Sequence, residues 1–360
     1  MIPKTLVGWG KLASALLIGL AGALLFNWLQ TPLPWLLGPM AACLLAALLR
    51  APQDAPEFIM PPVRIILGVM IGASFTPDIL GQLQVMTLSL AFLVPYLALI
   101  GLCCVPYMQR LGKLDPATAY FGAMPGGLID MIIFGKSFGG DQRQLALAHS
   151  TRVLVIVFAV PFFIEYGMGL ALSEVEAFSA PWHTLSLSEA ALLTATGIAG
   201  WWLAKKLRLV GATITGPMIA SAVVHVTGLS SAAPPDELMK FAQFMVGTAI
   251  GCAFAQAKVI EILKAIWLAL GLCVIMAAIT AIFVMILVQL TPLSPISLLL
   301  AYAPGGQGEM NLIALALNED VAFIAIHHML RVFLVISAAP IVFAWLKRRE
   351  AGKKTGNSQS

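Results

Sequence analysis

Long apolar runs, separated by short polar or Gly/Pro-containing breaks, recur along almost the whole chain. A helix needs about 20 such residues to cross a bilayer, and these runs approach or exceed that length. Ten predicted spans lie at 6–27, 33–49, 63–81, 86–108, 144–172, 188–204, 209–228, 238–257, 262–290 and 321–346. Such runs lack the strict alternation of β-barrel strands. The pattern therefore predicts an all-α polytopic membrane protein.

Two further apolar stretches, 117–137 and 296–317, are interrupted near their middle by the same tripeptide, Pro-Gly-Gly. The interruptions are Pro125, Gly126 and Gly127 in the first stretch, and Pro304, Gly305 and Gly306 in the second. Proline removes a backbone donor and glycine lowers helix propensity. Each stretch is therefore expected to form a broken helix or re-entrant hairpin rather than a continuous span.

Composition agrees with a membrane protein. The 360 residues are 60% hydrophobic and 11% charged, with a mean hydropathy of +0.93, whereas soluble domains carry about 25% charged residues. A soluble globular enzyme is excluded on this basis, and no basic run is typical of a nucleic-acid partner. The five cysteines lie in apolar segments without a C-x-x-C pair. They are expected to be small core residues, with no metal site and no cofactor.

The chain is internally duplicated. At an offset of 179 residues scarce residue types coincide, and Asp130 falls opposite Glu309. The identical pairs are Gly68/Gly247, Ile71/Ile250, Gly72/Gly251, Phe75/Phe254, the two Pro-Gly-Gly tripeptides, Met131/Met310, Asp141/Asp320, His149/His328, Arg152/Arg331 and Pro161/Pro340. At an offset of 178, Gly38-Pro39-Met40 matches Gly216-Pro217-Met218.

This duplication divides the chain into four parts. They are an N-terminal membrane repeat at 1–172, an acidic linker at 173–189, a C-terminal membrane repeat at 190–346 and a basic cytoplasmic tail at 347–360, which is expected to be disordered.

The distribution of basic residues predicts the orientation of the repeats. With a cytoplasmic N-terminus and about ten crossings, 18 of the 21 Lys and Arg residues fall in cytoplasmic loops. Twelve full crossings would instead place Lys205, Lys206 and Arg208 outside. Five transmembrane helices and one broken hairpin in each half give two inverted-topology repeats. Both termini would then be cytoplasmic in a multi-pass membrane protein.

Inverted repeats with broken helices that meet near the membrane midplane are typical of secondary transporters. The helix that begins after each Gly-Gly pair presents free amides and a positive dipole end, which favour an anion. The predicted substrate-binding residues are Pro125, Gly126, Gly127, Asp130, Arg152, Pro304, Gly305, Gly306, Gln307, Glu309, Asn311 and Arg331. The ion-coupling candidates are Asp130, Glu309, His149 and His328. No catalytic residue is predicted.

Two interpretations of Arg152 and Arg331 stay open. An arginine at mid-span is costly unless it is paired or faces a wet cavity, so each is a candidate ligand of a solute carboxylate or phosphate, or a partner released when Asp130 or Glu309 is protonated. Alternatively, each holds a broken helix in place by binding a hairpin carboxylate or freed carbonyls. The two histidines of the shared pattern are expected to be packing residues bonded to carbonyls. His327 has Ala148 opposite it and lies outside that pattern.

These features resemble the AbrB-type duplicated membrane proteins. The resemblance rests on Pro34-Trp35-Leu36-Leu37-Gly38-Pro39-Met40, the two Pro-Gly-Gly hairpins and the arginine in the helix after each, and it covers nearly the whole chain. It implies a bacterial inner-membrane transporter of two homologous halves without a settled substrate. Members of the family also carry labels as regulators of gene expression or as ammonia monooxygenases. The dispersed histidines do not favour a copper oxygenase.

The sequence thus predicts a secondary transporter or exporter of a small anionic or zwitterionic metabolite, in contact with the lipid bilayer and coupled to H⁺ or Na⁺. No G-x-x-x-x-G-K-[ST] motif indicates ATP as the energy source. The alternative is a membrane protein with an indirect regulatory role in gene expression, and an intramembrane enzyme ranks third. The second hairpin carries Gln307, Glu309 and Asn311 where the first has Leu128, Asp130 and Ile132, so an asymmetric site is expected.

Overall fold

A computed structural model describes residues 6–77, 79–170, 185–209, 211–232 and 234–356. The first half contains α1 (Leu6–Trp28), α2 (Pro34–Leu48), α3 (Met60–Ala73), α4 (Ile79–Arg110), α5 (Pro116–Ala123), α6 (Leu128–Ser137), α7 (Gln142–Phe162) and the π-helical turn η1 (Phe163–Gly167). The second half contains α8 (Leu187–Lys206), α9 (Ala212–Val226), α10 (Asp236–Cys252), α11 (Val259–Leu290), α12 (Pro295–Tyr302), α13 (Gln307–Ala316) and α14 (Val321–Gly356). The all-helical prediction is confirmed for the described chain.

Each predicted span overlaps a helix, but the helices differ from the spans in their bounds and from one another in length. Within the described residues, five helical segments are long and apolar enough to cross a membrane: Gly8–Trp28, Gln84–Arg110, Gln142–Gly167, Val259–Leu290 and Val321–Arg349. The helices α2, α3 and α9 are apolar but shorter, with 15, 14 and 15 residues. At about 1.5 Å per residue, such a helix covers roughly 22 Å of a hydrocarbon core of about 30 Å. The α3 helix ends early because Pro77 follows it closely.

Both Pro-Gly-Gly stretches are broken helices, as predicted. In the first half α5 ends at Ala123 and α6 begins at Leu128, while in the second half α12 ends at Tyr302 and α13 begins at Gln307. Each first helix has a proline at its first turn and a capping side chain before it. Asp115 accepts hydrogen bonds from two backbone amides at 3.0 Å each, and Ser294 occupies the equivalent position before α12.

The two halves pack on each other through reciprocal contacts between α3 and α9 and between α10 and α2. Added Cβ atoms would lie 2.5 Å from the Ile214 carbonyl oxygen at Gly68 and 2.2 Å from the Leu36 carbonyl oxygen at Gly247. Leu36 and Ile214 are themselves equivalent at the offset of 178. The close approach of these helices therefore requires glycine in both halves, and the same contact occurs twice.

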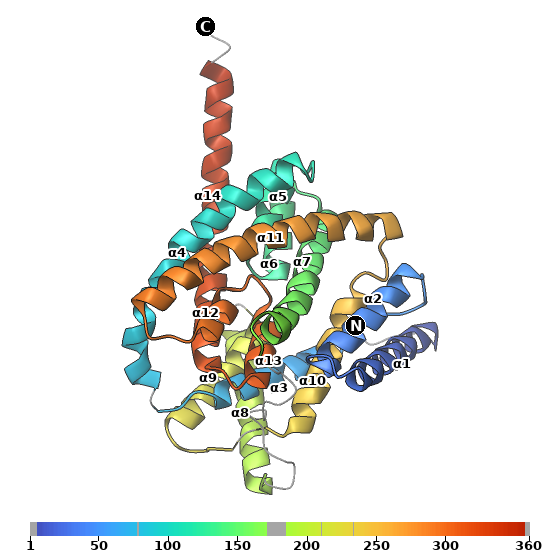
Figure 1. Ribbon diagram of the computed structural model, residues 1–360, viewed down its shortest axis with the longest axis vertical. Coiled ribbons are helices and arrows are strands. Elements are labelled where there is room, and N and C mark those ends of the chain that lie inside the picture. The colour runs from blue at the N-terminus through green and yellow to red at the C-terminus, as the bar shows by residue number, and fades with distance from the viewer. Residues whose placement is uncertain (1–5, 78, 171–184, 210, 233, 357–360) are drawn as a thin grey trace.

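The helices form two groups. The first, which we call the scaffold, consists of α1, α2, α3, α8, α9 and α10, and the second contains α4–α7 and α11–α14. Figure 1 shows α4 and α11, each of 32 residues, lying side by side with α7 packed beside α11. The hairpins lie within the second group, and α13 reaches the scaffold. Exposed apolar residues such as Leu17, Trp267 and Val274 suit contact with lipid.

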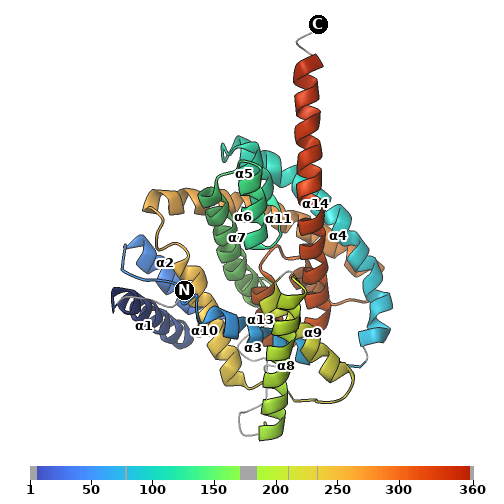
Figure 2. The ribbon, with the colours of Figure 1, turned by 180° about the vertical axis from the view of Figure 1, so that it is seen from behind.

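The structure describes only part of each polar segment, the linker at 173–189 and the tail at 347–360. The acidic linker at 173–189 lies mostly outside the described residues, although its last residues start α8, where Ser186 accepts a hydrogen bond from the Glu189 amide at 3.2 Å. The tail differs from the expected disorder, because α14 continues through residues 347–356 and projects beyond the other helices (Figure 2). Lys, Arg, Glu and Ala are good helix formers, and no proline interrupts them.

Candidate functional site

Arg331 on α14 binds the break between α12 and α13. Its side chain is 2% exposed, and its guanidinium donates to the Ala303 carbonyl at 2.6 Å and to the Gly305 carbonyl at 2.8 Å. The same group donates to His328 Nδ1 at 2.9 Å. These two carbonyls are freed by the break, so Arg331 joins α14 to the hairpin at the Pro-Gly-Gly tripeptide.

Arg152 on α7 has the equivalent position but fewer contacts. It is 3% exposed and donates to the Met124 carbonyl at 3.1 Å, which also accepts from the Gly126 amide at 2.9 Å. Within the described chain no carboxylate lies at ion-pair distance from Arg152 or Arg331. This geometry matches the interpretation in which the arginines bind freed carbonyls. Binding of a solute by either arginine stays a prediction.

The two histidines of the repeat bond to carbonyls, as expected for packing residues. His149 Nε2 lies 3.1 Å from the Phe121 carbonyl and His328 Nε2 lies 2.9 Å from the Leu300 carbonyl. A carbonyl can only accept, so each Nε2 carries hydrogen. Because Arg331 can only donate, His328 Nδ1 must be an acceptor. His328 is therefore held neutral by its contacts.

The hairpin acids fold back over their own helix starts. A Cβ added at Gly127 would lie 2.5 Å from Asp130 Oδ2, and one added at Gly306 would lie 1.9 Å from Glu309 Oε2. The positive end of each half-helix, where the sequence predicts a bound anion, thus already has a carboxylate of the protein beside it. Arg64 on α3 is close enough to Glu309 to interact with it electrostatically.

The two hairpins are placed differently, which supports the expected asymmetry. In α6, Leu128, Ile129 and Ile133 are 40%, 61% and 58% exposed. In α13, Gly308 and every residue from Met310 to Ala316 are buried. The reason is that α13 packs against α3 and α10 of the scaffold, whereas α6 makes its contacts with α5, α7 and α14.

The polar residues of α13 contribute to this docking. Gln307 Nε2 lies 3.8 Å from Met218 Sδ on α9. Asn311 Nδ2 donates to the Gln307 carbonyl at 2.7 Å, and Asn311 Oδ1 is buried without a hydrogen-bond partner. Asn311 is thus a buried acceptor in the predicted site that remains available to a ligand.

Two clefts, each lined by residues of both halves, open at places that the repeat relates to each other. The larger, of about 1080 Å³, lies where α4 ends and α7 and α11 begin, and its lining includes Lys113, Arg143 and Lys264. The smaller, of about 410 Å³, lies where α4, α12 and α14 begin. Their linings correspond at the offset of 179. The matched pairs are Lys113/Pro292, Leu114/Leu293, Asp141/Asp320, Gln144/Phe323, Lys264/Val85 and Ala265/Met86.

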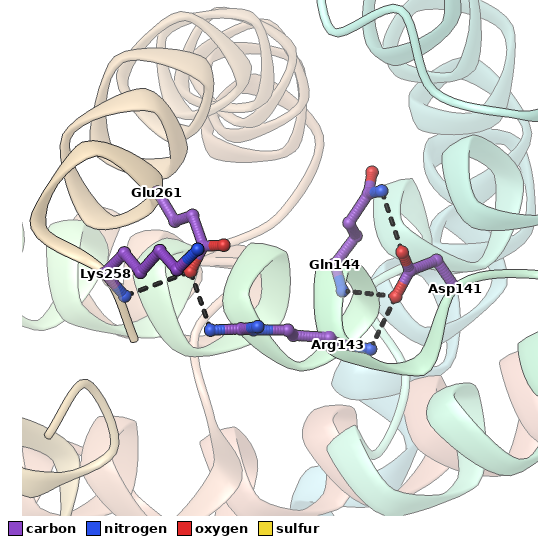
Figure 3. A network of polar contacts seen from close by, with 5 residues as sticks. All are labelled: Asp141, Arg143, Gln144, Lys258 and Glu261. Atoms are coloured by element: carbon purple, nitrogen blue, oxygen red, sulfur yellow. Dashed lines mark hydrogen bonds and ion pairs between the residues drawn. The ribbon is translucent and has the colours of Figure 1, made fainter. Parts of the chain in front are cut away.

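A charged network crosses the rim of the larger cleft (Figure 3). Arg143 at the start of α7 forms an ion pair of 2.7 Å with Glu261 at the start of α11, and Glu261 also accepts from the Lys258 amide at 3.0 Å. Asp141 caps α7, and the Gln144 backbone amide lowers the pKa of its carboxyl. The position equivalent to Arg143 is Ala322, so this connection exists at only one of the two clefts.

A buried polar cluster was missed by the sequence reasoning. It consists of Ser89, Tyr96, Thr280, Tyr302 and His327, which we call the polar cluster. His327 Nε2 lies 2.9 Å from Ser89 Oγ. Tyr302 donates to the Ser89 carbonyl, and Tyr96 donates to the Tyr302 carbonyl at 2.6 Å and lies 3.0 Å from Thr280 Oγ1. The repeat carried a usable signal, because none of these residues has a polar counterpart.

Across the described ranges, no group of three or more His, Cys, Asp or Glu residues could hold a metal ion. Four of the cysteines are buried and Cys103 is exposed.

Comparison with known proteins gave two kinds of match. The sequence profile of a family described as transition state regulatory protein AbrB matches residues 35–347. The uncharacterized protein YhjN of Bacillus subtilis strain 168 is 24% identical, over 95% of this chain and 94% of its own length. A protein of Escherichia coli strain K12 is 27% identical over 93% of this chain and 95% of its own length. Its name describes it as a candidate regulator, AbrB.

Proposed function

The chain belongs to the AbrB family, whose profile matches residues 35–347. From this membership and the helical membrane fold we propose that the protein is a secondary transporter. Its solute is a small anionic or zwitterionic metabolite, carried in or out of the cell across the bacterial inner membrane with an ion gradient. The protein is not an enzyme under this proposal. The observation that carries it is the pair of clefts at equivalent positions, one about 1080 Å³ and the other about 410 Å³.

The proposed topology has about ten crossings in two inverted repeats with both termini in the cytoplasm. The basic rim of the larger cleft then faces the cytoplasm, in agreement with the positive-inside rule. The smaller cleft, with Glu319 and Asp320 in its lining, faces outward. Single cysteines at Ser137 and Asn318 test this arrangement with an impermeant thiol reagent. Labelling from opposite sides supports the inversion, and labelling from one side refutes it.

In alternating access, a transporter opens one of two equivalent clefts in one state and the other cleft in the second state. A chain observed in one of these states should therefore have unequal clefts. In the described state α13 is docked on the scaffold and α6 is not. Exchanging the roles of the two halves would bring α6 onto the scaffold. The contact of Gln307 with Met218 would be replaced by a contact of Leu128 with Met40, and the exposed face of α6 would become buried.

The anionic class of solute follows from charge. Arg152 and Arg331 are buried, and among the described residues no carboxylate pairs with either of them. Two uncompensated cations in a membrane interior favour an anionic ligand. Asn311 Oδ1 adds a buried acceptor, which suits a solute that also carries a donor such as an ammonium group.

Crosslinking tests the exchange directly. In a background without the five native cysteines, the pair Gln307→Cys/Met218→Cys should crosslink in the described state, and the pair Leu128→Cys/Met40→Cys should crosslink only in the exchanged state. A matched control joins Leu128→Cys to Trp267→Cys, a position on the exposed face of α11.

We expect both test pairs to crosslink in native membranes and the control pair not to. Each crosslinked form should lose counterflow of amino acids and small carboxylates in proteoliposomes, and reduction should restore it. If the Leu128/Met40 pair never crosslinks while the Gln307/Met218 pair does, the protein has one state and the transporter proposal fails.

The regulatory alternative is supported by the name of the Escherichia coli relative. A regulator that does not transport would change gene expression, and the counterflow experiment would show no solute flux. Persistence of the regulatory effect in a chain locked by the Gln307/Met218 crosslink would favour this second candidate.

A further inference from the structure

The polar cluster, built by α4 together with α11, α12 and α14, occurs at only one of two places that the repeat relates to each other. The positions equivalent to Ser89, Tyr96, Thr280, Tyr302 and His327 are Leu268, Ile275, Gly101, Ala123 and Ala148. The equivalent place, built by α11 together with α4, α5 and α7, thus has the same arrangement of helices without these polar groups, so the fold does not require them. Burying polar groups costs free energy unless every hydrogen bond is made. The presence of these five polar residues at only one of the two equivalent places therefore indicates a function.

The contacts of His327 are suited to two protonation states. Its Nδ1 lies 2.8 Å from the Phe323 carbonyl, which can only accept, so Nδ1 carries hydrogen. Its Nε2 lies 2.9 Å from the Ser89 hydroxyl, which can donate or accept. The Ser89 hydroxyl also lies 2.8 Å from the Met86 carbonyl.

Rotation of one hydroxyl hydrogen therefore satisfies both states. When the His327 imidazole is neutral, Ser89 donates to Nε2. When the imidazole is protonated, Nε2 donates to the Ser89 oxygen, and Ser89 donates to the Met86 carbonyl instead. Every polar atom keeps a partner in either state without movement of a heavy atom.

The other histidines of the site lack this property. His328 Nδ1 accepts from Arg331, so protonating it would place two donors against each other. His149 Nδ1 is buried with no hydrogen-bond partner. Protonation of His149 would therefore bury an unsatisfied donor. This argues against both histidines as ion-coupling residues and leaves His327, which the repeat pattern had set aside.

The position of His327 connects the smaller cleft to the arginines. Met86 and Phe323 line that cleft, and the next turns of the same helices carry Ser89 and His327. One further turn along α14 lies Arg331. A proton entering from the cleft thus meets His327 before it reaches the hairpin breaks.

The charged and titratable groups around His327 determine when it holds a proton. On α14 these are His328, which its contacts hold neutral, the cationic Arg331, whose positive charge opposes a second cation one turn away, and Asp320 near the cleft. On α12 it is Tyr302, whose ring centroid lies 6.0 Å from that of His327, while α4 presents the neutral Ser89 hydroxyl. An anion bound at Arg331 would cancel the opposing charge.

We propose that His327, with Ser89 as its switching partner, binds the proton that couples to anion transport. This inference rests on the proposed transporter function and names its coupling ion. A proton and an anion would bind together, because each reduces the electrostatic cost of the other.

Nuclear magnetic resonance of the full chain with ¹³C-labelled histidine in lipid nanodiscs tests the proton site without any solute. The resonance that His327→Gln removes should shift with pH in a single step while the protein stays folded, and that of His328 should not move. Ser89→Ala should lower the midpoint by about one pH unit or more, since the charged form loses its acceptor. Ser89→Thr should restore it, and Thr280→Val, elsewhere in the polar cluster, should leave it unchanged.

A second measurement covers the case in which a Ser89 variant does not fold. Potentiometric titration of the folded protein should show one fewer proton taken up by His327→Gln than by the wild type. A His327 resonance that is constant across the folded pH range, or an unchanged midpoint in Ser89→Ala, would overturn the proposal. Titration of His327 in a protein that fails the crosslinking test would overturn transport alone, so the two failures are distinguishable.

Discussion

Replacing Arg331 by methionine tests how the broken helix is held. Methionine matches the length of the aliphatic stem but has no donor. In Arg331→Met the Ala303 and Gly305 carbonyls lose the guanidinium that binds them at 2.6 and 2.8 Å. In Arg152→Met the Met124 carbonyl keeps the Gly126 amide.

The comparison of the two variants isolates the acceptors that Arg331 alone serves, which are those carbonyls and His328 Nδ1. Arg152 and Arg331 are similarly buried, so removing either charge relieves a similar desolvation cost. A buried acceptor left without a partner costs about 1–3 kcal/mol. Three orphaned acceptors, the two carbonyls and His328 Nδ1, should therefore make Arg331→Met less stable than Arg152→Met by about 3–9 kcal/mol.

Unfolding in mixed micelles of a mild detergent and sodium dodecyl sulfate, followed by circular dichroism at equilibrium, measures this difference. Arg331→Lys, which retains the charge and can reach one carbonyl, should fall between the wild type and Arg331→Met. Equal stability of the two methionine variants, or a lower stability of Arg152→Met, would refute the reasoning. It would also leave binding of a solute, without a role in holding the break, as the function of the arginines.

Three further predictions follow from local geometry. Gly306→Ala places a Cβ 1.9 Å from the present position of Glu309 Oε2, so the carboxylate should leave the start of α13 and become reactive to a carbodiimide that leaves the wild type unmodified. Gly216→Ala places a Cβ 2.3 Å from a carbonyl of α8 and should lower the unfolding free energy by about 1–3 kcal/mol, whereas Gly10→Ala, with open space around it, should not. Asp141→Ala removes the cap of α7 and should cost about 1 kcal/mol at neutral pH. Because the pKa of Asp141 is lowered on folding, that contribution is present above the unfolded pKa of about 3.9 and disappears as the pH falls through the folded value, so the two chains should converge in acid.

Local chemistry made most of the helices predictable. The breaks at Pro125 and Pro304 were readable because proline and two glycines oppose a helix whatever surrounds them. Boundaries were less accurate where a turn inside an apolar run ended a helix, as between α3 and α4. The helical extension of α14 past residue 347 was missed because a basic, polar composition was taken as a sign of disorder rather than of helix formation.

The candidate site was predictable in its members but not in its contacts. Arg152 and Arg331 were identified because charge inside an apolar helix is rare. Their partners lie 28 residues earlier, at Met124 and Ala303, a separation that no helical periodicity connects. His327 was set aside because the equivalent position in the other repeat is Ala148. The same lack of a polar counterpart is shared by all members of the polar cluster and sets it apart from the repeated residues.

The sequence by itself determined the class of protein, the duplication and the places where helices break, because hydropathy, residue identity and proline chemistry act over a few neighbouring residues. Only the tertiary structure decided that α13 docks on the scaffold while α6 stays exposed, that the equivalent clefts are unequal, and that the hairpin acids lie beside the starts of their own half-helices. These depend on packing between segments far apart in the chain. Two halves with nearly the same local pattern can satisfy that packing in different ways.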